Sequence, residues 1–365
     1  MTSLTAQPLL FQPEFEQIPD DEAQTAQGLI EALHSILQTT FDDYGHPVRS
    51  VHAKAHGFMQ GELHVLDGLP EPLAQGVFAR PGRYPVVMRL STNPGDLLDD
   101  RVSTPRGLAV KIIGVDGERL PGSEGAVTQD LVMQNAQAFT AADPKTFLKT
   151  LKLLARTTDR VPGLKRAFSA TLRGVEAVVE AAGGESATLK SLGGHPITHP
   201  LGESYNTVVP LLYGRYYAKI SVAPVSPELE ALAGSKVDLN GNPDGLREAV
   251  KRFLAEHDAW WEVRVQLATD LDKMPIEDAS AVWPEDLSPY VPVARIHVPA
   301  QASFSEAGVR QVDEDMSFSP WHGLAAHRPL GGVMRVRKPA YEHSVAFRRE
   351  HSGCPIHEPG GPLRF

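Results

Sequence analysis

Cysteine is nearly absent from this sequence. The single cysteine, Cys354, excludes a disulfide within one chain and a metal site built from several cysteines, and it agrees with a reducing compartment. Long apolar runs are also missing, so no segment is predicted to span a membrane. The N-terminal residues lack the basic region that opens a signal peptide and soon become acidic, and we therefore expect a cytoplasmic protein.

Positive charge is scarce as well. The formal net charge is −10, and no basic run offsets it, so a phosphate backbone would be repelled. Nucleic acid is therefore not expected as a partner. Hydrophobic residues make up 42% of the chain and charged residues 22%, which is ordinary for a soluble globular protein.

The patterning predicts mixed secondary structure without repeats. Apolar residues at helical spacing predict a helix over 21–40, and short apolar runs separated by Gly, Pro and Asp predict strands between 48 and 135. Further strands are predicted over 205–225, 262–269 and 291–299, and further helices over 143–157, 165–182, 244–261 and 339–350. Strands on both sides of a helical block indicate one α+β domain, built on an antiparallel β-barrel with helices packed on it.

One predicted strand, VRSVHAKAHGFMQG at 48–61, carries an unusual number of polar side chains. His52, Lys54 and His56 would share one face of it, and Arg49 would lie on the other face unless a bulge intervenes. Taken alone, the pattern fits a solvent-exposed strand face better than a site.

A second polar group lies almost three hundred residues later. Pro339 suits the first turn of a helix, and from Tyr341 the steps to Ser344 and Arg348 follow one helical face. Arg337 lies one turn before Tyr341. Paired cations favour the phenolate over the phenol, and tyrosine is a known proximal ligand of haem iron. A solvated surface helix would show the same spacing, so the pattern leaves both interpretations open.

Several segments together resemble the catalase superfamily, specifically its shorter one-domain haem proteins. The segments, in the order expected for that family, are RSVHAKAHG, VMRLST, RGLAVKI, DLVMQNAQAFTAADPKTF and RKPAY. The resemblance implies a catalase-like antiparallel β-barrel with packed helices around a buried haem b. It also implies an N-terminal arm and helix at 1–44, a haem domain at 45–350 and a C-terminal tail at 351–365, which its Gly and Pro content predicts to be mobile.

Residue roles follow from the resemblance position by position. It implies the catalytic residues His52 as distal histidine, Ser91 as its hydrogen-bond partner, and Gln134 or Asn135 as distal amide. It implies the cofactor-binding residues Arg49, Arg89, Phe147, Arg337, Tyr341 and Arg348, with Tyr341 as the iron ligand. The implied activity is decomposition of hydrogen peroxide or small organic peroxides, with an organic electron donor as a further partner.

Departures from the family pattern leave alternatives. Catalases have adjacent asparagines where this chain has Gln134 and Asn135, which changes the reach of the amide. One rival is a catalase-related enzyme that rearranges fatty-acid hydroperoxides, as allene oxide synthase does; Val51, before the distal histidine, argues against it because that branch has threonine there. Another is a haem-binding module without turnover. The long arms of large catalases are missing, so we expect a homo-oligomer that need not be the family tetramer.

Overall fold

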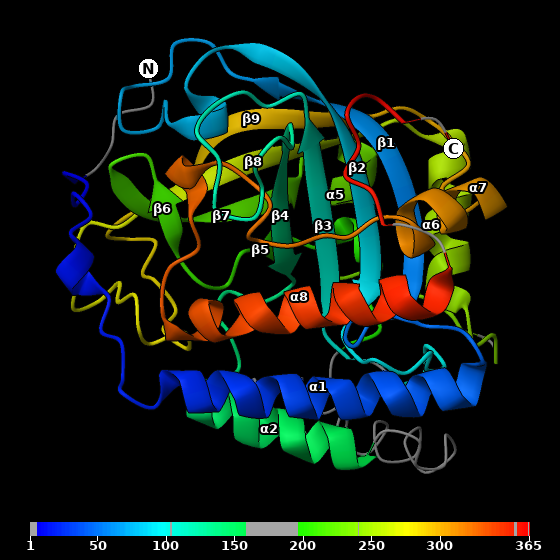
Figure 1. The fold of residues 1–365 in the computed structure, drawn as a ribbon. Helices are drawn as coiled ribbons and strands as arrows, with labels where there is room; N and C mark the ends of the chain where they lie inside the picture. The colour runs from blue at the N-terminus through cyan, green and yellow to red at the C-terminus, as the bar shows by residue number, and fades with distance from the viewer. Residues whose placement is uncertain (1–5, 103, 158–195, 240, 354–355, 364) are drawn as a thin grey trace, which may run out of the picture.

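The computed structural model describes residues 6–102, 104–157, 196–239, 241–353, 356–363 and 365. Its centre is a curved antiparallel β-sheet (Figure 1). The strands are β1 (Ala55–Val65), β2 (Gly82–Thr92), β3 (Arg106–Ile113), β4 (Thr128–Gln134), β5 (Tyr205–Asn206), β6 (Leu211–Tyr213), β7 (Tyr216–Pro224), β8 (Ala259–Leu267) and β9 (Val291–Val298).

Long-range pairing closes this sheet into a barrel. Strand β1 pairs with β9 near the other end of the chain, where Glu62 lies opposite His297. Strand β5 pairs with β4 through Asn206 and Gln134, and with β7 through Asn206 and Ser221. Within the described residues, eight strands thus form a closed antiparallel ring, and β6 extends it beside β7. The predicted α+β class with an antiparallel β-barrel is confirmed.

Buried and half-buried side chains alternate along the strands, and the buried ones fill the barrel interior. In β8, Trp261, Val263 and Val265 are buried, whereas Glu262 and Arg264 between them are half-buried on the other face. A strand with this period of two can bury one face in the barrel and leave the other toward solvent or a helix. The barrel interior is therefore a packed apolar core, and ligand-binding sites are expected on the outer surface of the barrel.

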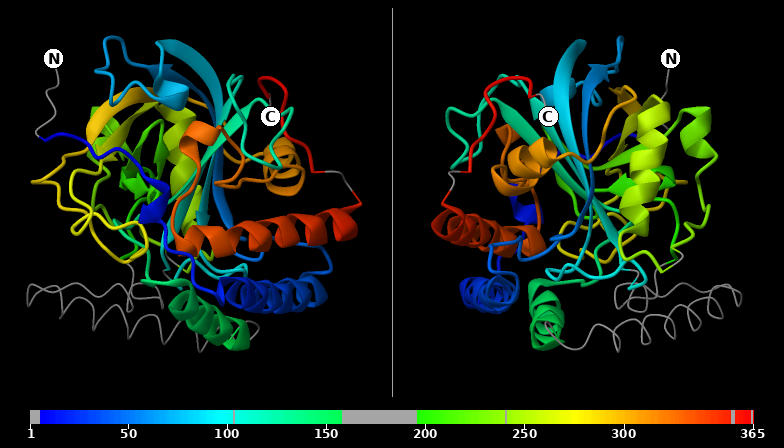
Figure 2. Two further views of the ribbon diagram at one scale, coloured as in Figure 1. Left: turned by 60° about the vertical axis from the view of Figure 1, so that its left-hand side comes forward. Right: turned by 90° about the vertical axis from the view of Figure 1, so that its right-hand side faces the viewer.

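Three long helices form a layer on one side of the barrel. They are α1 (Glu22–Tyr44), α2 (Pro144–Thr157) and α8 (Gly332–Ser352), and α1 lies between the other two in the view of Figure 1. Figure 2 shows the same three helices stacked below the strands. Leu29, Leu33 and Ile36 of α1 pack with Leu151 of α2 and Val336 of α8, so burial of these apolar faces holds the layer together.

Shorter elements connect the layers. Helix α6 (Gly245–Glu256) packs on β1, and α5 (Pro227–Glu230) packs near β8. Helix α7 (Glu306–Gly308) continues into one π-helical segment, η4 (Val309–Glu314). The 3-10 helices are η1 (Pro13–Phe15), η2 (Gly76–Phe78), η3 (Pro200–Gly202) and η5 (Ala325–His327).

Several predicted boundaries are wrong. Strand β1 begins only at Ala55, because residues 48–54 run as irregular chain in which His52 adopts a left-handed backbone. Helix α8 begins at Gly332, seven residues before Pro339, and tertiary packing tolerates this proline inside the helix. Helix α6 ends at Glu256, and the Trp260 region belongs to β8. The predicted helix at 165–182 lies outside the described residues.

The C-terminal segment is packed and does not fit the predicted mobile tail where it is described. Helix α8 continues to Ser352, and after it Ile356 is buried and Glu358 enters a buried polar cluster on the barrel wall. Leu363 and Phe365 pack against the cluster that contains Phe58. Among the described residues, no helix is long and apolar enough to cross a membrane.

Candidate active site

A large cavity lies between the barrel and the helical layer. Its volume is about 1180 Å³ when counted out to its open mouth. The walls come from α1, the irregular segment before β1, β4, α2 and α8. The polar lining residues are Arg49, Ser50, His52, Asn93, Gln134, Thr140, Thr150, Ser317, Arg337, Tyr341, Ser344 and Arg348, and the apolar ones include Leu29, Leu33, Val51, Phe139, Phe147 and Leu151. The fold thus brings Arg49 and His52 of the first polar group together with the second group on α8.

His52 is held rigidly in this cavity. Its backbone has φ 55°, a conformation that non-glycine residues adopt rarely and that often marks a functional position. The imidazole Nδ1 lies 3.1 Å from Ser91 Oγ. Gly107 makes room for the ring, since a Cβ there would lie 2.6 Å from His52 Nδ1. Burial, followed by the positive charges of Arg89, Arg337 and Arg49, lowers the pKa of His52 to about 3, so the imidazole is neutral at neutral pH.

The two adjacent amides have different positions. Gln134, the last residue of β4, lines the cavity. Asn135 turns away from it: its Oδ1 accepts from the Arg106 backbone N–H at 2.8 Å, and its Nδ2 donates to Glu203 at 2.5 Å. Of the two predicted distal amides, the structure therefore directs Gln134 toward the site and commits Asn135 to a buried polar network.

Tyr341 and Arg337 form a pair on the wall supplied by α8. Arg337 Nη2 donates to Tyr341 Oη at 2.8 Å, one helical turn along the same face. The guanidinium also lies 5.5 Å from the centre of the Phe139 ring. The cation is thereby held against the phenol oxygen on the wall of the cavity.

Three arginines converge on Asp313 beside the cavity, two on its carboxylate and one on its backbone carbonyl. We name Arg49, Arg89, Arg348 and Asp313 the arginine cluster. Asp313 Oδ1 lies 2.6 Å from Arg49 Nη1 and 2.8 Å from Arg89 Nη2, and Arg348 donates to the backbone carbonyls of Asp313 and Glu314. Burial raises the pKa of Asp313, but the charges of Arg89 and Arg49 outweigh it and the net pKa is lowered. The cluster therefore holds three cations against one carboxylate.

Members of the arginine cluster differ in their access to the cavity. Arg49 and Arg348 line it. Arg89 instead donates to Asp313 and to the backbone carbonyls of His52 and Ala53, so it supports the segment that carries His52. Burial, followed by the charges of Arg348 and Arg89, lowers the pKa of Arg49 well below its usual range.

Of the remaining predicted residues, Phe147 lines the cavity and packs edge-on against Phe139 with ring centres 5.0 Å apart. The polar residues after His52 lie elsewhere. Lys54 is buried in an ion pair with Asp100 at 2.7 Å, and His56 is buried near Thr92. Sequence reasoning missed Asp313 and Glu203, because no local pattern tells which carboxylate will meet a distant arginine.

Comparison with known proteins identifies the fold. No protein-family model matches the sequence, and no curated protein matches it. Among solved structures, a fungal catalase matches with a TM-score of 0.61 and 19% identity, over 90% of this chain and 65% of that one. Catalase A from Saccharomyces cerevisiae matches with a TM-score of 0.59 and 18% identity, over 100% of this chain and 72% of that one.

A bacterial catalase matches similarly, with a TM-score of 0.55 and 17% identity, over 98% of this chain and 69% of that one. The chain therefore has the catalase fold and spans roughly two thirds of the length of these structural neighbours. At this level of identity the likeness defines the fold, and the chemistry must be argued from the cavity.

Proposed function

We propose that this protein is a haem-dependent oxidoreductase that decomposes hydrogen peroxide or small organic peroxides. One observation carries the proposal: His52 and Tyr341 line the same cavity. His52 is held there by its contact with Ser91, and Tyr341 by its contact with Arg337. These pairs come from opposite ends of the chain, and a structural role for either would not require a large cavity between them. The catalase fold supports the same assignment.

The residues present fit haem b. The arginine cluster has two more positive charges than negative ones, and Arg49 and Arg348 present this excess to the cavity, as the two carboxylates of haem require. Tyr341 offers a phenol oxygen, and tyrosine is one of the side chains that bind haem iron. Phe139 and Phe147 supply apolar walls. When bound, haem would supply an iron centre that exchanges two electrons with peroxide.

His52 is the proposed proton carrier. Because its pKa is lowered to about 3, the imidazole remains an unprotonated base over the physiological pH range. With Nδ1 directed at Ser91 Oγ, the other ring nitrogen, Nε2, is left to take a proton from one peroxide oxygen and deliver it to the other. The proposed role of Ser91 is to fix the ring orientation for this transfer.

Gln134 and Val51 complete the proposed peroxide side of the cavity. The Gln134 amide would donate a hydrogen bond that orients the peroxide, and Val51 would keep an apolar surface beside His52. A threonine at position 51 would compete for the imidazole, so its absence favours peroxide decomposition over rearrangement of fatty-acid hydroperoxides.

To test the proposal, haem is supplied to the purified protein and an absorption spectrum is recorded. Hydrogen peroxide and then an organic hydroperoxide are added, and the response to each is measured. We expect a ferric tyrosinate-type Soret band and release of oxygen from hydrogen peroxide. Tyr341→Phe should lose the band, whereas Tyr84→Phe, at a partly buried position of β2 outside the cavity lining, should keep it. Absence of a Soret band in the wild-type protein would refute the haem proposal, and turnover confined to the organic hydroperoxide would favour a peroxidase or rearranging enzyme.

A further inference from the structure

The unusual backbone of His52 depends on contacts with its surroundings. Among the described residues, only His52 and Val208 have a positive φ without being glycine, and the φ of His52 is 55°. The backbone N–H of His52 donates to the Asn93 carbonyl at 2.7 Å, and that of Ala53 donates to the Pro94 carbonyl at 3.0 Å. These bonds satisfy the N–H groups of the bend, and its carbonyls need partners as well.

Arg89 supplies the donors for those carbonyls. Its Nη2 donates to the His52 carbonyl at 2.9 Å and to the Ala53 carbonyl at 3.1 Å. In an extended strand neighbouring carbonyls point in opposite directions, so two consecutive carbonyls meet one nitrogen only where the backbone bends. The left-handed conformation of His52 lies at this bend, and such a conformation persists only where surrounding contacts hold it. One nitrogen of Arg89 thus holds both carbonyls of the bend.

Access to the cavity separates Arg89 from the other arginines of the cluster. Arg49 and Arg348 line the cavity, whereas Arg89 is absent from the described residues that line it. Arg89 Nε donates to Asp313 Oδ1 at 2.9 Å, so this side of the guanidinium is directed at the cluster. The resemblance to catalases implies that Arg89 binds the cofactor, but its contacts favour a role in the wall that carries His52.

One face of β2 holds both ends of His52. Arg89 and Ser91 are two residues apart in this strand, so their side chains leave the same face. Arg89 binds the backbone of His52, and Ser91 Oγ lies 3.1 Å from the imidazole Nδ1. Gly107, which pairs with Ser91 on the adjacent β3, makes room for the ring, since a Cβ there would lie 2.6 Å from the imidazole Cε1. The orientation of the imidazole thereby depends on Arg89 as well as on Ser91.

Arg89 also acts on His52 through its charge. Burial is the largest cause that lowers the pKa of His52 to about 3, and the positive charge of Arg89 is the next. An uncharged residue at position 89 would therefore raise this pKa. The charge and the hydrogen bonds of Arg89 can be separated by mutation, because lysine keeps the charge and loses the planar fork of donors.

We propose that Arg89 is a positioning residue for His52: it holds the two carbonyls so that imidazole Nε2 faces the peroxide, and it does not bind the haem carboxylates. This inference rests on the proposed function. Arg49 and Arg348, which line the cavity, are left to meet the carboxylates. A displacement of about 1 Å in an active site can cost about 10²-fold in rate, so losing this hold should lower turnover without loss of haem.

The first experiment uses neither haem nor peroxide. Nuclear magnetic resonance of protein with labelled histidine measures the nuclear Overhauser contact between the His52 ring and the Gly107 Hα protons, which lie close together. We expect Arg89→Lys to weaken this contact at least about twofold, because the bend loses its fork of donors. Arg83→Lys, at an exposed position of the same strand, should leave it unchanged. An unchanged contact in Arg89→Lys would overturn the positioning role.

The same spectra contain a control for folding and a test of charge. His327 is buried against Gly76, where a Cβ would lie 2.6 Å from its Cε1, so this pair should keep its contact in Arg89→Lys. In a pH titration, Arg89→Gln should raise the pKa of His52 above that of the wild type, whereas Arg89→Lys should not. An unchanged pKa in Arg89→Gln would contradict the close contact on which the proposal depends.

The second experiment compares haem affinity with turnover for the same substitution at two positions. Titration with haem, followed at the Soret band, should give Arg89→Lys an affinity within about twofold of the wild type, whereas Arg348→Lys should bind haem about tenfold more weakly. At saturating peroxide, Arg89→Lys should lower kcat per bound haem by about 10²-fold. Equal losses of affinity in the two variants, or a wild-type kcat in Arg89→Lys, would overturn the proposal.

Failure of the proposed function looks different. The wild-type protein would then bind no haem or release no oxygen, and the second experiment would have no signal in any variant. The resonance spectra would still decide whether Arg89 orients His52, because they are recorded without haem.

Discussion

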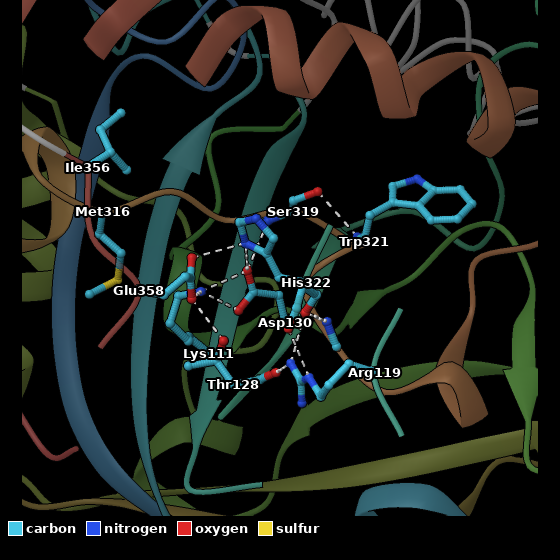
Figure 3. Close-up of polar contacts among 12 residues, drawn as sticks. Lys111, Arg119, Thr128, Asp130, Met316, Ser319, Trp321, His322, Ile356 and Glu358 are labelled. Carbon is cyan, nitrogen blue, oxygen red and sulfur yellow. Dashed lines mark hydrogen bonds and ion pairs between the residues drawn. The ribbon is translucent and has the colours of Figure 1, made fainter. Parts of the chain in front are cut away.

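Two ionic groups beside the barrel differ in how their charges are paired. The arginine cluster places Arg49, Arg89 and Arg348 around one carboxylate and faces a cavity. In the ionic cluster of Figure 3, Lys111 and His322 each contact both Asp130 and Glu358, and Arg119 beside them donates to Ser123 and Thr128.

The difference shows which cluster is complete. Taking charge out of water is costly unless it is paired, so a buried group in which each carboxylate meets two cations and each of these cations meets two carboxylates can serve structure alone. A group with surplus charge beside a cavity is incomplete and fits a ligand of opposite sign. By this argument the arginine cluster belongs to a binding site, and the cluster around Asp130 belongs to the scaffold.

The largest expected effect is on peroxide turnover, and it comes from removing His52, the proposed general base beside the arginine cluster. His52→Ala should lower peroxide turnover by about 10²- to 10⁴-fold, the usual contribution of a positioned general base. His56→Ala, at a buried histidine outside the cavity, should lower stability and keep turnover per bound haem. The measurement is oxygen release normalised to the Soret absorbance. Equal losses of normalised turnover in the two variants would contradict the assignment of His52.

Removing the lone carboxylate of the arginine cluster should come next in size. Asp313→Asn removes the carboxylate that pairs with Arg49 and Arg89 and should lower the free energy of unfolding by about 3 to 5 kcal/mol in haem-free protein. The loss should be smaller after haem is supplied, because its carboxylates would pair with the arginines. Urea denaturation with and without haem measures both values, and Asp286→Asn at an exposed position is the control. An equal loss in the two states would argue against haem carboxylates at this cluster.

Breaking the balanced cluster should cost less and leave the chemistry intact. Glu358→Gln keeps the shape but removes one charge from the partners Lys111 and His322, and should lower the free energy of unfolding by about 1 to 3 kcal/mol. Glu350→Gln, on the exposed face of α8, is the matched control. Urea denaturation gives the difference, and an unchanged stability would mean that the C-terminal segment is not held by this pair.

The smallest effect concerns pH. The pKa of His322 in the folded chain, about 9, lies above its ordinary value of 6.5, so its contribution is fully present below pH 6.5 and is lost as the pH rises through 9. The stability difference between wild type and His322→Gln should therefore shrink by about 1 kcal/mol or more between pH 6 and pH 9.5. Urea denaturation at the two pH values tests this, and a difference that grows with pH would contradict it.

The lowered pKa of Glu358 affects stability at acidic pH. Contacts with His322 and Lys111 outweigh burial and bring this pKa to about 2, below the ordinary 4.5. Its contribution is thus present above pH 4.5 and lost as the pH falls through 2. The two contributions overlap fully between pH 4.5 and 6.5, where we expect the C-terminal segment to be held most firmly.

The sequence by itself determined the kinds of element and the residues with reactive chemistry. Apolar periodicity gave α1 and most strands, because a helix or strand must bury one face wherever it lies. The Arg337 and Tyr341 spacing was sufficient to place both on one helical face, and the segments that resemble catalases named His52 and Ser91. These properties are local, so a window of sequence contains them.

Only the tertiary structure decided which distant groups meet. The left-handed backbone of His52, the start of α8 at Gly332 and the choice of Gln134 over Asn135 each depend on packing that outweighs local preference. Asp313 and Glu358 gain their partners from strands more than two hundred residues away. Charge balance in a buried cluster is a sum over such long-range contacts, and for this reason no local pattern could separate the incomplete cluster from the complete one.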